Sequence, residues 1–183
     1  LSAGRYLGSN GTETAGTVGY NLAGASYDSV SFDVSSQSTQ PGNVLFSSDG
    51  TKMYIVNQAG ASSSVEQYNL TTAYDISTAS HSSADSLTVG TEDTSPFGIT
   101  FKPDGTKLYV TGSTGDNVYQ YTLTTGYDLS TASYDSVSFS YNSQDTATTG
   151  TLFNSDGTKI YMLGAGTDAI YQYSLSTAYD VST

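Results

Sequence analysis

The sequence predicts an all-β protein built from repeated four-stranded antiparallel units. A ten-residue signature of strand, turn and strand occurs three times, at Phe46–Ile55, Phe101–Val110 and Phe153–Met162. The Asp-Gly pairs inside the copies begin at positions 49, 104 and 156, so the spacing is 55 and then 52 residues. Asp-Gly between two apolar runs is a strong hairpin signal, because glycine takes a positive φ at little steric cost.

A repeat of about 50 residues that holds four strands matches the blade of a β-propeller. A β-solenoid is the competing interpretation. Its coils are usually shorter and lack tight Asp-Gly hairpins, so we favour the propeller. The chain then amounts to about three and a half four-stranded antiparallel blades.

The elements follow in order along one continuous domain. We expect a partial N-terminal blade at 1–32, whole blades at 42–89 and 98–139, and a partial C-terminal blade at 150–183. The strands expected in the first whole blade are Asn43–Phe46, Lys52–Val56, Val65–Leu70 and Asp85–Val89, with a long turn at Thr71–Thr78. Those expected in the second are Gly98–Phe101, Lys107–Thr111, Val118–Leu123 and Asp135–Phe139. The last unit has Gly150–Phe153, Lys159–Leu163 and Ile170–Leu175, and it lacks a fourth strand.

This blade number has a physical consequence. Propellers close with about four to eight blades, and closure protects the edges of their sheets. We therefore expect a segment of a larger propeller, a multi-chain propeller, or an open assembly joined edge to edge. Two copies of about 14 predicted strands would supply seven four-stranded blades.

Composition excludes several kinds of partner. The net charge is −12, which disfavours nucleic acid and anionic membrane surfaces, because both attract clustered Lys and Arg. There is no cysteine, hence no disulfide framework and no thiolate metal site. No apolar run approaches the ~20 residues of a membrane span. The sequence opens on Leu1 and shows no signal-peptide pattern, so we expect a processed chain or a piece of a longer one. We predict no cofactor and no metal.

The segment Gly98–Val110, which reads Gly-Ile-Thr-Phe-Lys-Pro-Asp-Gly-Thr-Lys-Leu-Tyr-Val, resembles the repeats of YVTN and lactonase-like propellers. With Tyr119–Val137 added, it is similar to Tyr- and Ser-rich propeller repeats in tail and virion-associated proteins of marine phages and in bacterial surface proteins. The resemblance covers nearly the whole chain. It implies the blade, and propellers of the YVTN type often have seven, but a shared fold does not imply a shared activity.

Most of the conspicuous side chains have structural interpretations. Tyr residues that recur in every unit are expected to pack between blades. Each Asp-Gly-Thr-Lys turn holds one carboxylate, too few for a calcium loop. Glu92 and Asp93 form the only adjacent acidic pair, which a solvated loop explains. His81 is the single histidine, and no cluster of His, Glu and Arg accompanies it to support hydrolysis.

Ligand binding is expected in the loops that differ most between units. These are Gln58–Ser64, Ser80–Ala84, Gly90–Ser95 and Asn142–Thr149. Tyr141 stands out of the repeat register beside Asn142 and Gln144. The candidate ligand-binding residues are therefore Tyr141, Asn142, Gln144, His81 and Gln58.

The sequence thus predicts a non-enzymatic structural or adhesive propeller module on a virion or outside a cell. Its loops would bind a protein partner or a glycan, and other chains, as a homo-oligomer or as the remainder of the propeller, would complete it. One alternative is an architectural protein that polymerises through open sheet edges. A lactonase-like hydrolase is the less favoured alternative.

Overall fold

The computed structural model describes residues 6–7, 13–14 and 25–183, and it divides the chain into the units Leu1–Val30 and Ser31–Thr183. In the first unit, β1 (Tyr6–Leu7) pairs antiparallel with β2 (Glu13–Thr14). The partial blade predicted at 1–32 falls mostly outside the described residues and stays a prediction.

The second unit consists of three antiparallel sheets, which we number as blades 1 to 3. Blade 1 contains β3 (Pro41–Phe46), β4 (Lys52–Asn57), β5 (Ser64–Leu70) and β6 (Ala79–Thr88). Blade 2 contains β7 (Pro96–Phe101), β8 (Lys107–Gly112), β9 (Asn117–Leu123) and β10 (Ala132–Ser140). Blade 3 contains β11 (Thr148–Phe153), β12 (Lys159–Gly164) and β13 (Ala169–Ser174). Neighbours in each sheet are consecutive in the chain, so the prediction of all-β, blade-like antiparallel sheets is confirmed.

Three short 3-10 helices, η2 (Gly60–Ser62), η3 (Ile76–Thr78) and η4 (Leu129–Thr131), lie in loops of this unit. In the part of the chain that the structure describes, no helix has the length and apolar character needed to cross a membrane.

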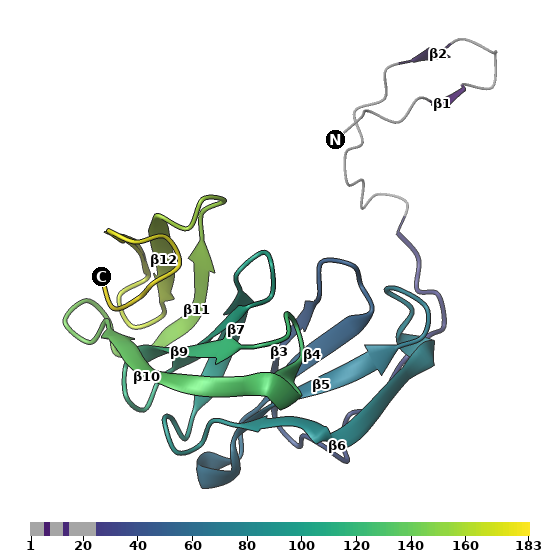
Figure 1. Cartoon of the computed structure of the whole chain (residues 1–183), viewed down its shortest axis with the longest axis horizontal. Helices are drawn as coiled ribbons and strands as arrows, with labels where there is room; N and C mark the ends of the chain where they lie inside the picture. Colours follow the sequence, from purple (N-terminus) through teal and green to yellow (C-terminus); the bar gives the residue numbers. More distant parts are fainter. Residues whose placement is uncertain (1–5, 8–12, 15–24) are drawn as a thin grey trace. The chain divides into compact units, whose positions relative to one another are not determined.

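The first strands of the three blades lie together. Strand β7 contacts β3 on one side and β11 on the other. These three first strands are the inner strands, and each sheet runs outward from its own inner strand (Figure 1). Blades 1 and 2, and blades 2 and 3, therefore face each other through their side chains. These two contacts, which we call junctions, hold most of the buried apolar residues.

The outer strand of blade 1 differs from its prediction. Strand β6 already begins at Ala79, so the segment Ser80–Ala84 lies within a strand and not in a loop. His81 pairs with Tyr68 and Ser86 pairs with Glu66, so a bulge in β6 takes up residues 82–85 between these pairs. The Ser-rich sequence carries no strand signal of its own, and pairing with β5 supplies the order.

The Asp-Gly turns are held by their own side chains. Gly50, Gly105 and Gly157 have φ angles of 72°, 74° and 73°, in the left-handed region. The Asp104 carboxylate accepts hydrogen bonds from the Thr106 N–H at 3.0 Å and from its hydroxyl at 2.6 Å. The Asp-Gly-Thr sequence is thus explained by the turn itself.

We expect Gly105→Ala to lower the free energy of unfolding by about 2 kcal/mol, measured by urea titration. A Cβ at this position would lie 2.3 Å from a ring carbon of Tyr127, and φ is positive. Gly150→Ala is the matched control, because its Cβ would meet no atom within 4 Å. Equal losses in the two variants would contradict this account of the turn.

Stability should fall at acid pH through the turn carboxylates. The Thr51 N–H lowers the pKa of Asp49 to about 2, and the Lys102 side chain lowers the pKa of Asp104 to about 2. Both values lie below the ~3.9 of an unfolded Asp, so this contribution is present above pH ~4 and is lost as pH falls to about 2.

Urea titrations between pH 7 and pH 2 check this pH dependence. We expect a decline below about pH 4 that is shallower in Asp49→Asn/Asp104→Asn. A wild-type stability that stays constant down to pH 2 would refute it.

Candidate functional site

Blades 1 and 2 meet through a tyrosine and a glutamine that hold a turn of the next blade. The Tyr54 hydroxyl donates to the carbonyl oxygen of Tyr127 at 2.5 Å, and the Tyr54 ring packs on Phe101 with centroids 4.8 Å apart. The Gln67 side-chain oxygen accepts from the Leu129 N–H at 2.9 Å. Both hydrogen bonds end on the backbone of one turn.

Blades 2 and 3 repeat these contacts. The Tyr109 hydroxyl donates to the Tyr179 carbonyl oxygen at 2.5 Å, and its ring lies 4.5 Å from that of Phe153. The Gln120 side-chain oxygen accepts from the Val181 N–H at 3.1 Å. The held segments, which we call Tyr-Asp turns, are Tyr127–Thr131 and Tyr179–Thr183, and blade 1 carries a third at Tyr74–Thr78. Each junction is therefore one face that receives the Tyr-Asp turn of the following blade.

Blade 3 presents the same face without a following blade in the described chain. This open face consists of Leu152, Tyr161, Leu163, Ile170 and Gln172. Ile170 is 72% exposed, whereas its repeat equivalents Val65 and Val118 are fully buried in the two junctions. Leu152 and Leu163 are 67% and 50% exposed. An apolar face of this kind usually marks an interaction surface.

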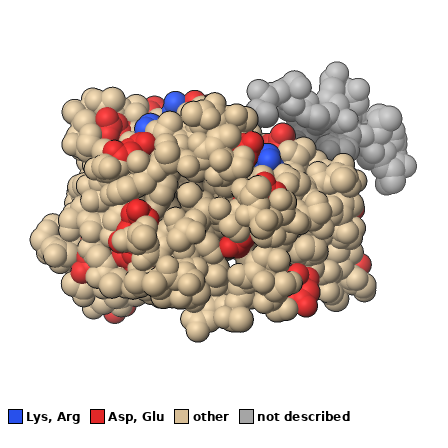
Figure 2. Space-filling view, turned by 60° about the horizontal axis from the view of Figure 1, so that its bottom comes forward, with Lys and Arg blue, Asp and Glu red and all other residues tan. Residues whose placement is uncertain are grey.

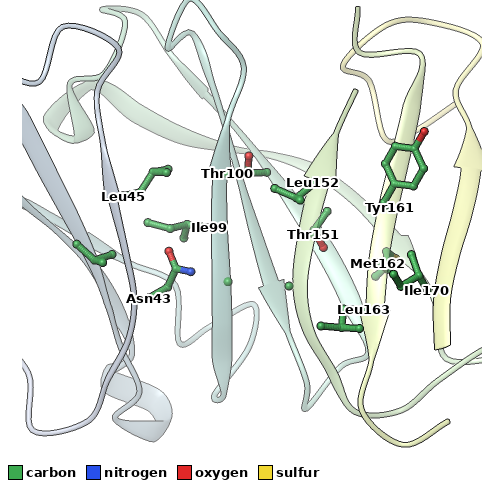
Figure 3. Close-up of a pocket in the computed structure, with 13 residues that line it drawn as sticks. Asn43, Leu45, Ile99, Thr100, Thr151, Leu152, Tyr161, Met162, Leu163 and Ile170 are labelled. Carbon is green, nitrogen blue, oxygen red and sulfur yellow. The ribbon is translucent and has the colours of Figure 1, made fainter. Parts of the chain in front are cut away.

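A groove of about 540 Å³ runs along the inner strands and onto the open face (Figure 3). Its apolar lining includes Val44, Leu45, Ile99, Leu152, Leu163 and Ile170. Its polar side chains are Asn43, Thr100, Thr151 and Tyr161, and no charged side chain lines it. The groove therefore suits an uncharged, largely apolar surface.

Buried carboxylates fix the loops between blades. The Asp93 carboxylate is 3% exposed and accepts from the N–H groups of Ser95 at 2.8 Å and Gly115 at 2.7 Å. Asp145 accepts likewise from Ala147 at 2.6 Å and Thr167 at 2.8 Å. The Thr167 hydroxyl contributes most to lowering the pKa of Asp145. The expectation of a solvated loop was wrong for Asp93, because its carboxylate ties the inter-blade loop to the β8–β9 hairpin.

His81 belongs to a small polar cluster in blade 1. Its Nε2 lies 2.9 Å from a carboxylate oxygen of Glu66, and its side chain is 15% exposed. The hydroxyls of Ser64 and Ser86 both donate to the Glu66 carboxylate. Within residues 25–183, no serine bonds to the His81 ring, so the nucleophile–base contact of a hydrolytic triad is missing there. The cluster serves strand pairing.

The structure gives Tyr141 a packing role. The ring is 1% exposed, and the hydroxyl donates to the Gly112 carbonyl oxygen at 2.6 Å. Its backbone contacts repeat those of Val89: the Tyr141 N–H donates to the Asp116 carbonyl oxygen and the Tyr141 carbonyl accepts from Asp145, as Val89 does with Ser63 and Asp93. Tyr141 is therefore the buried repeat equivalent of Val89 and not a residue outside the repeat. Being buried, it offers no surface to a ligand.

The remaining candidates occupy separate elements. Asn142 and Gln144 are exposed on the β10–β11 loop, and the Gln144 side-chain oxygen accepts from Tyr173 at 3.0 Å. Gln58 is half-buried in the β4–β5 loop, and His81 lies on β6. Only Asn142 and Gln144 share one exposed surface. In the described ranges, no group of three His, Asp or Glu side chains could hold a metal ion.

The arrangement defines an all-β protein with propeller-like blades, and comparisons with solved structures agree with that fold. The chain is similar to a protein of Bacteroides uniformis named provisionally as a 6-phosphogluconolactonase, with a TM-score of 0.50 and 12% identity over 77% of this chain and 40% of that one. It is also similar to hydrazine synthase of Kuenenia stuttgartiensis, with a TM-score of 0.51 and 13% identity over 76% of this chain and 46% of that one.

The chain thus spans less than half the length of either solved protein. No protein-family model and no curated protein matches the sequence. At such low identity the likeness shows the fold alone.

Proposed function

We propose that the chain is a non-enzymatic structural or adhesive propeller module that holds loops rigid for a partner. The observation that carries this proposal is the use of polar side chains in packing. Asp93 and Asp145 each fix a loop, and Glu66 with His81 joins two strands. Groups engaged in this way stiffen a binding surface instead of reacting. A location on a virion or cell surface remains a prediction from the repeat resemblance.

The exposed loop surface beside blade 3 favours an uncharged ligand. Asn142 and Gln144 present amides, and the Tyr171 hydroxyl lies 3.0 Å from the Gln144 carbonyl oxygen. Figure 2 shows one face on which acidic side chains are scattered and basic ones are few. Amides and a tyrosine suit the hydroxyl groups and apolar faces of a glycan.

A glycan array probed with the full chain tests the adhesive proposal. Binding that Asn142→Ala/Gln144→Ala abolishes, and that Ser130→Ala on the η4 turn leaves unchanged, would support it. An array without a hit, for both the single chain and any assembled form, would contradict glycan binding.

A lactonase activity is not favoured by the groove. A phosphorylated sugar lactone calls for cationic groups, and no charged residue lines the groove. We expect lactones to hydrolyse at the buffer rate in the presence of the chain. Turnover above that rate would overturn the non-enzymatic assignment.

Self-assembly is the second candidate function, and the open face of blade 3 favours it. Exposed Leu152, Leu163 and Ile170 form an apolar surface that two other blades bury against a neighbour.

A further inference from the structure

We propose that the open face of blade 3 binds the Tyr-Asp turn of blade 1, Tyr74–Thr78, in a second copy of the chain. The chain itself shows what covers such a face, because both junctions place a Tyr-Asp turn there. This inference rests on the self-assembly candidate above, for which it names the partner surface, and it is independent of the loop-display proposal.

The blade 1 turn has the shape that the junctions hold. Tyr74 has φ of 61°, against 64° for Tyr127 and 60° for Tyr179. The Asp75 carboxylate accepts from the Ser77 N–H at 3.0 Å, as Asp128 does from Ser130 at 3.1 Å. The turn is thus preformed, so little conformational entropy is lost when it docks.

Blade 1 also carries two of the three aromatic rings of a junction. In the junction of blades 2 and 3, the rings of Tyr109, Phe153 and Tyr179 pack in sequence as tilted pairs, with centroids 4.5 and 5.4 Å apart. Phe46 and Tyr74 form the corresponding pair, 5.6 Å apart. Tyr74 is 58% exposed, whereas Tyr179 is 9% exposed. Tyr161 of the open face has the repeat position of Tyr109 and supplies the third ring.

The residues around the rings on blade 1 and on the open face also have repeat equivalents that meet in the junctions. Val44 of β3 is 60% exposed, whereas its repeat equivalents Ile99 and Thr151 are 7% and 6% exposed in the junctions. Thr151 contacts Thr111 through their hydroxyls at 2.7 Å, and Leu163 has the repeat position of Thr111. Leu163 of one copy therefore packs on Val44 of the other.

Equivalent repeat positions also predict the two hydrogen bonds of a junction, one from the tyrosine hydroxyl and one to the glutamine oxygen. The Tyr161 hydroxyl donates to the Tyr74 carbonyl oxygen, and the Gln172 side-chain oxygen accepts from the Ile76 N–H. Two different faces meet, so the contact is heterologous and continues until a ring closes. Apart from Asp75, whose carboxylate is bonded within the turn to Ser77, the residues named for this contact are uncharged, so its affinity should depend little on salt.

Sedimentation equilibrium of the full chain tests the proposal. We expect an average mass that rises with concentration above 19.1 kDa, to twice that value if two copies close a ring and beyond it if more copies are needed. Ile170→Asp places a charge on the open face of blade 3, and Val44→Asp places one on the surface of blade 1 that binds it. Each variant alone should be monomeric. An equimolar mixture should form dimers, because each variant retains the face that the other lacks.

Several outcomes would overturn it. These are a wild-type chain that is monomeric at millimolar concentration, a Val44→Asp variant that still dimerises through two identical faces, and a mixture that stays monomeric. Both substituted residues are exposed, so the melting temperature of the monomer, measured at high dilution, should not change. Val118 is the buried repeat equivalent of Ile170, so Val118→Asp should unfold the chain. The conservative Tyr161→Phe should weaken dimerisation about three- to tenfold; an unchanged affinity would refute the assigned hydrogen bond.

Discussion

Tyr109→Ala is expected to lower the free energy of unfolding by about 4 kcal/mol, the upper part of the range for removing a buried aromatic side chain. Tyr109 is fully buried, and its hydroxyl bonds to the Tyr179 carbonyl oxygen across the junction. The substitution leaves a cavity between two blades and an unpaired buried carbonyl. Urea titration followed by circular dichroism measures the loss.

The repeat supplies the controls for this experiment. Tyr54→Ala should cause a similar loss, because Tyr54 makes the same contacts in the other junction. Tyr161→Ala, on the open face, should lower stability by less than about 1 kcal/mol when measured on monomer. Similar losses at all three positions would show that the tyrosines act within their own blades and not between them.

Asp145→Ala is expected to lower the urea midpoint and the melting temperature clearly, because several backbone donors lose a charged acceptor together. Its carboxylate accepts from Ala147, Gly166 and Thr167, and the side chain is almost fully buried. Thermal and urea unfolding measure the loss of stability. Asp93→Ala should cause a similar loss.

Glu92→Ala is the matched control for the carboxylate prediction. Glu92 is the neighbour of Asp93 and half-buried, and it accepts across the blade only from the Tyr121 hydroxyl, at 3.2 Å. We expect a loss below about 1 kcal/mol. If Glu92→Ala were as destabilising as Asp93→Ala, the loop-fixing role of Asp93 would be wrong.

The sequence was most informative where structure is local. The Asp-Gly turns placed β4, β8 and β12 almost to the residue, because a turn and its flanking strands depend on neighbours in sequence. The start of β6 was missed, since a Ser-rich segment becomes a strand only by pairing with β5. The burial of Tyr141 was missed for the same reason, as its partner Gly112 lies 29 residues earlier.

The sequence carries one further signal of the junctions, a recurring glutamine. Gln67, Gln120 and Gln172 recur one residue before the tyrosines of the third strand, and two of them hold a turn of the next blade. A recurring glutamine indicates a shared hydrogen bond, but its partner cannot be deduced from spacing. That partner lies about 60 residues away, in the next unit.

The loop carboxylates show a second limit of prediction. A Cβ on Gly112 would lie 2.2 Å from the Asp93 carboxyl carbon, so the carboxylate needs a glycine opposite. In blade 1 this pair is replaced by Ser38 and Asn57, whose side chains hydrogen-bond at 3.0 Å. The two positions change together, but they lie 19 residues apart in the sequence, and only the fold shows that they touch.

The most direct test of the junctions is a disulfide engineered across one of them. The hydroxyls of Thr111 on β8 and Thr151 on β11 lie 2.7 Å apart, and the chain has no cysteine of its own. We predict that Thr111→Cys/Thr151→Cys forms an intramolecular disulfide in air, seen as a mass 2 Da below that of the reduced chain. The control is Leu163→Cys/Thr151→Cys, which places the two cysteines on opposite faces of blade 3 and should form no intramolecular disulfide. Two free thiols in the first variant would mean that blades 2 and 3 do not face each other as described.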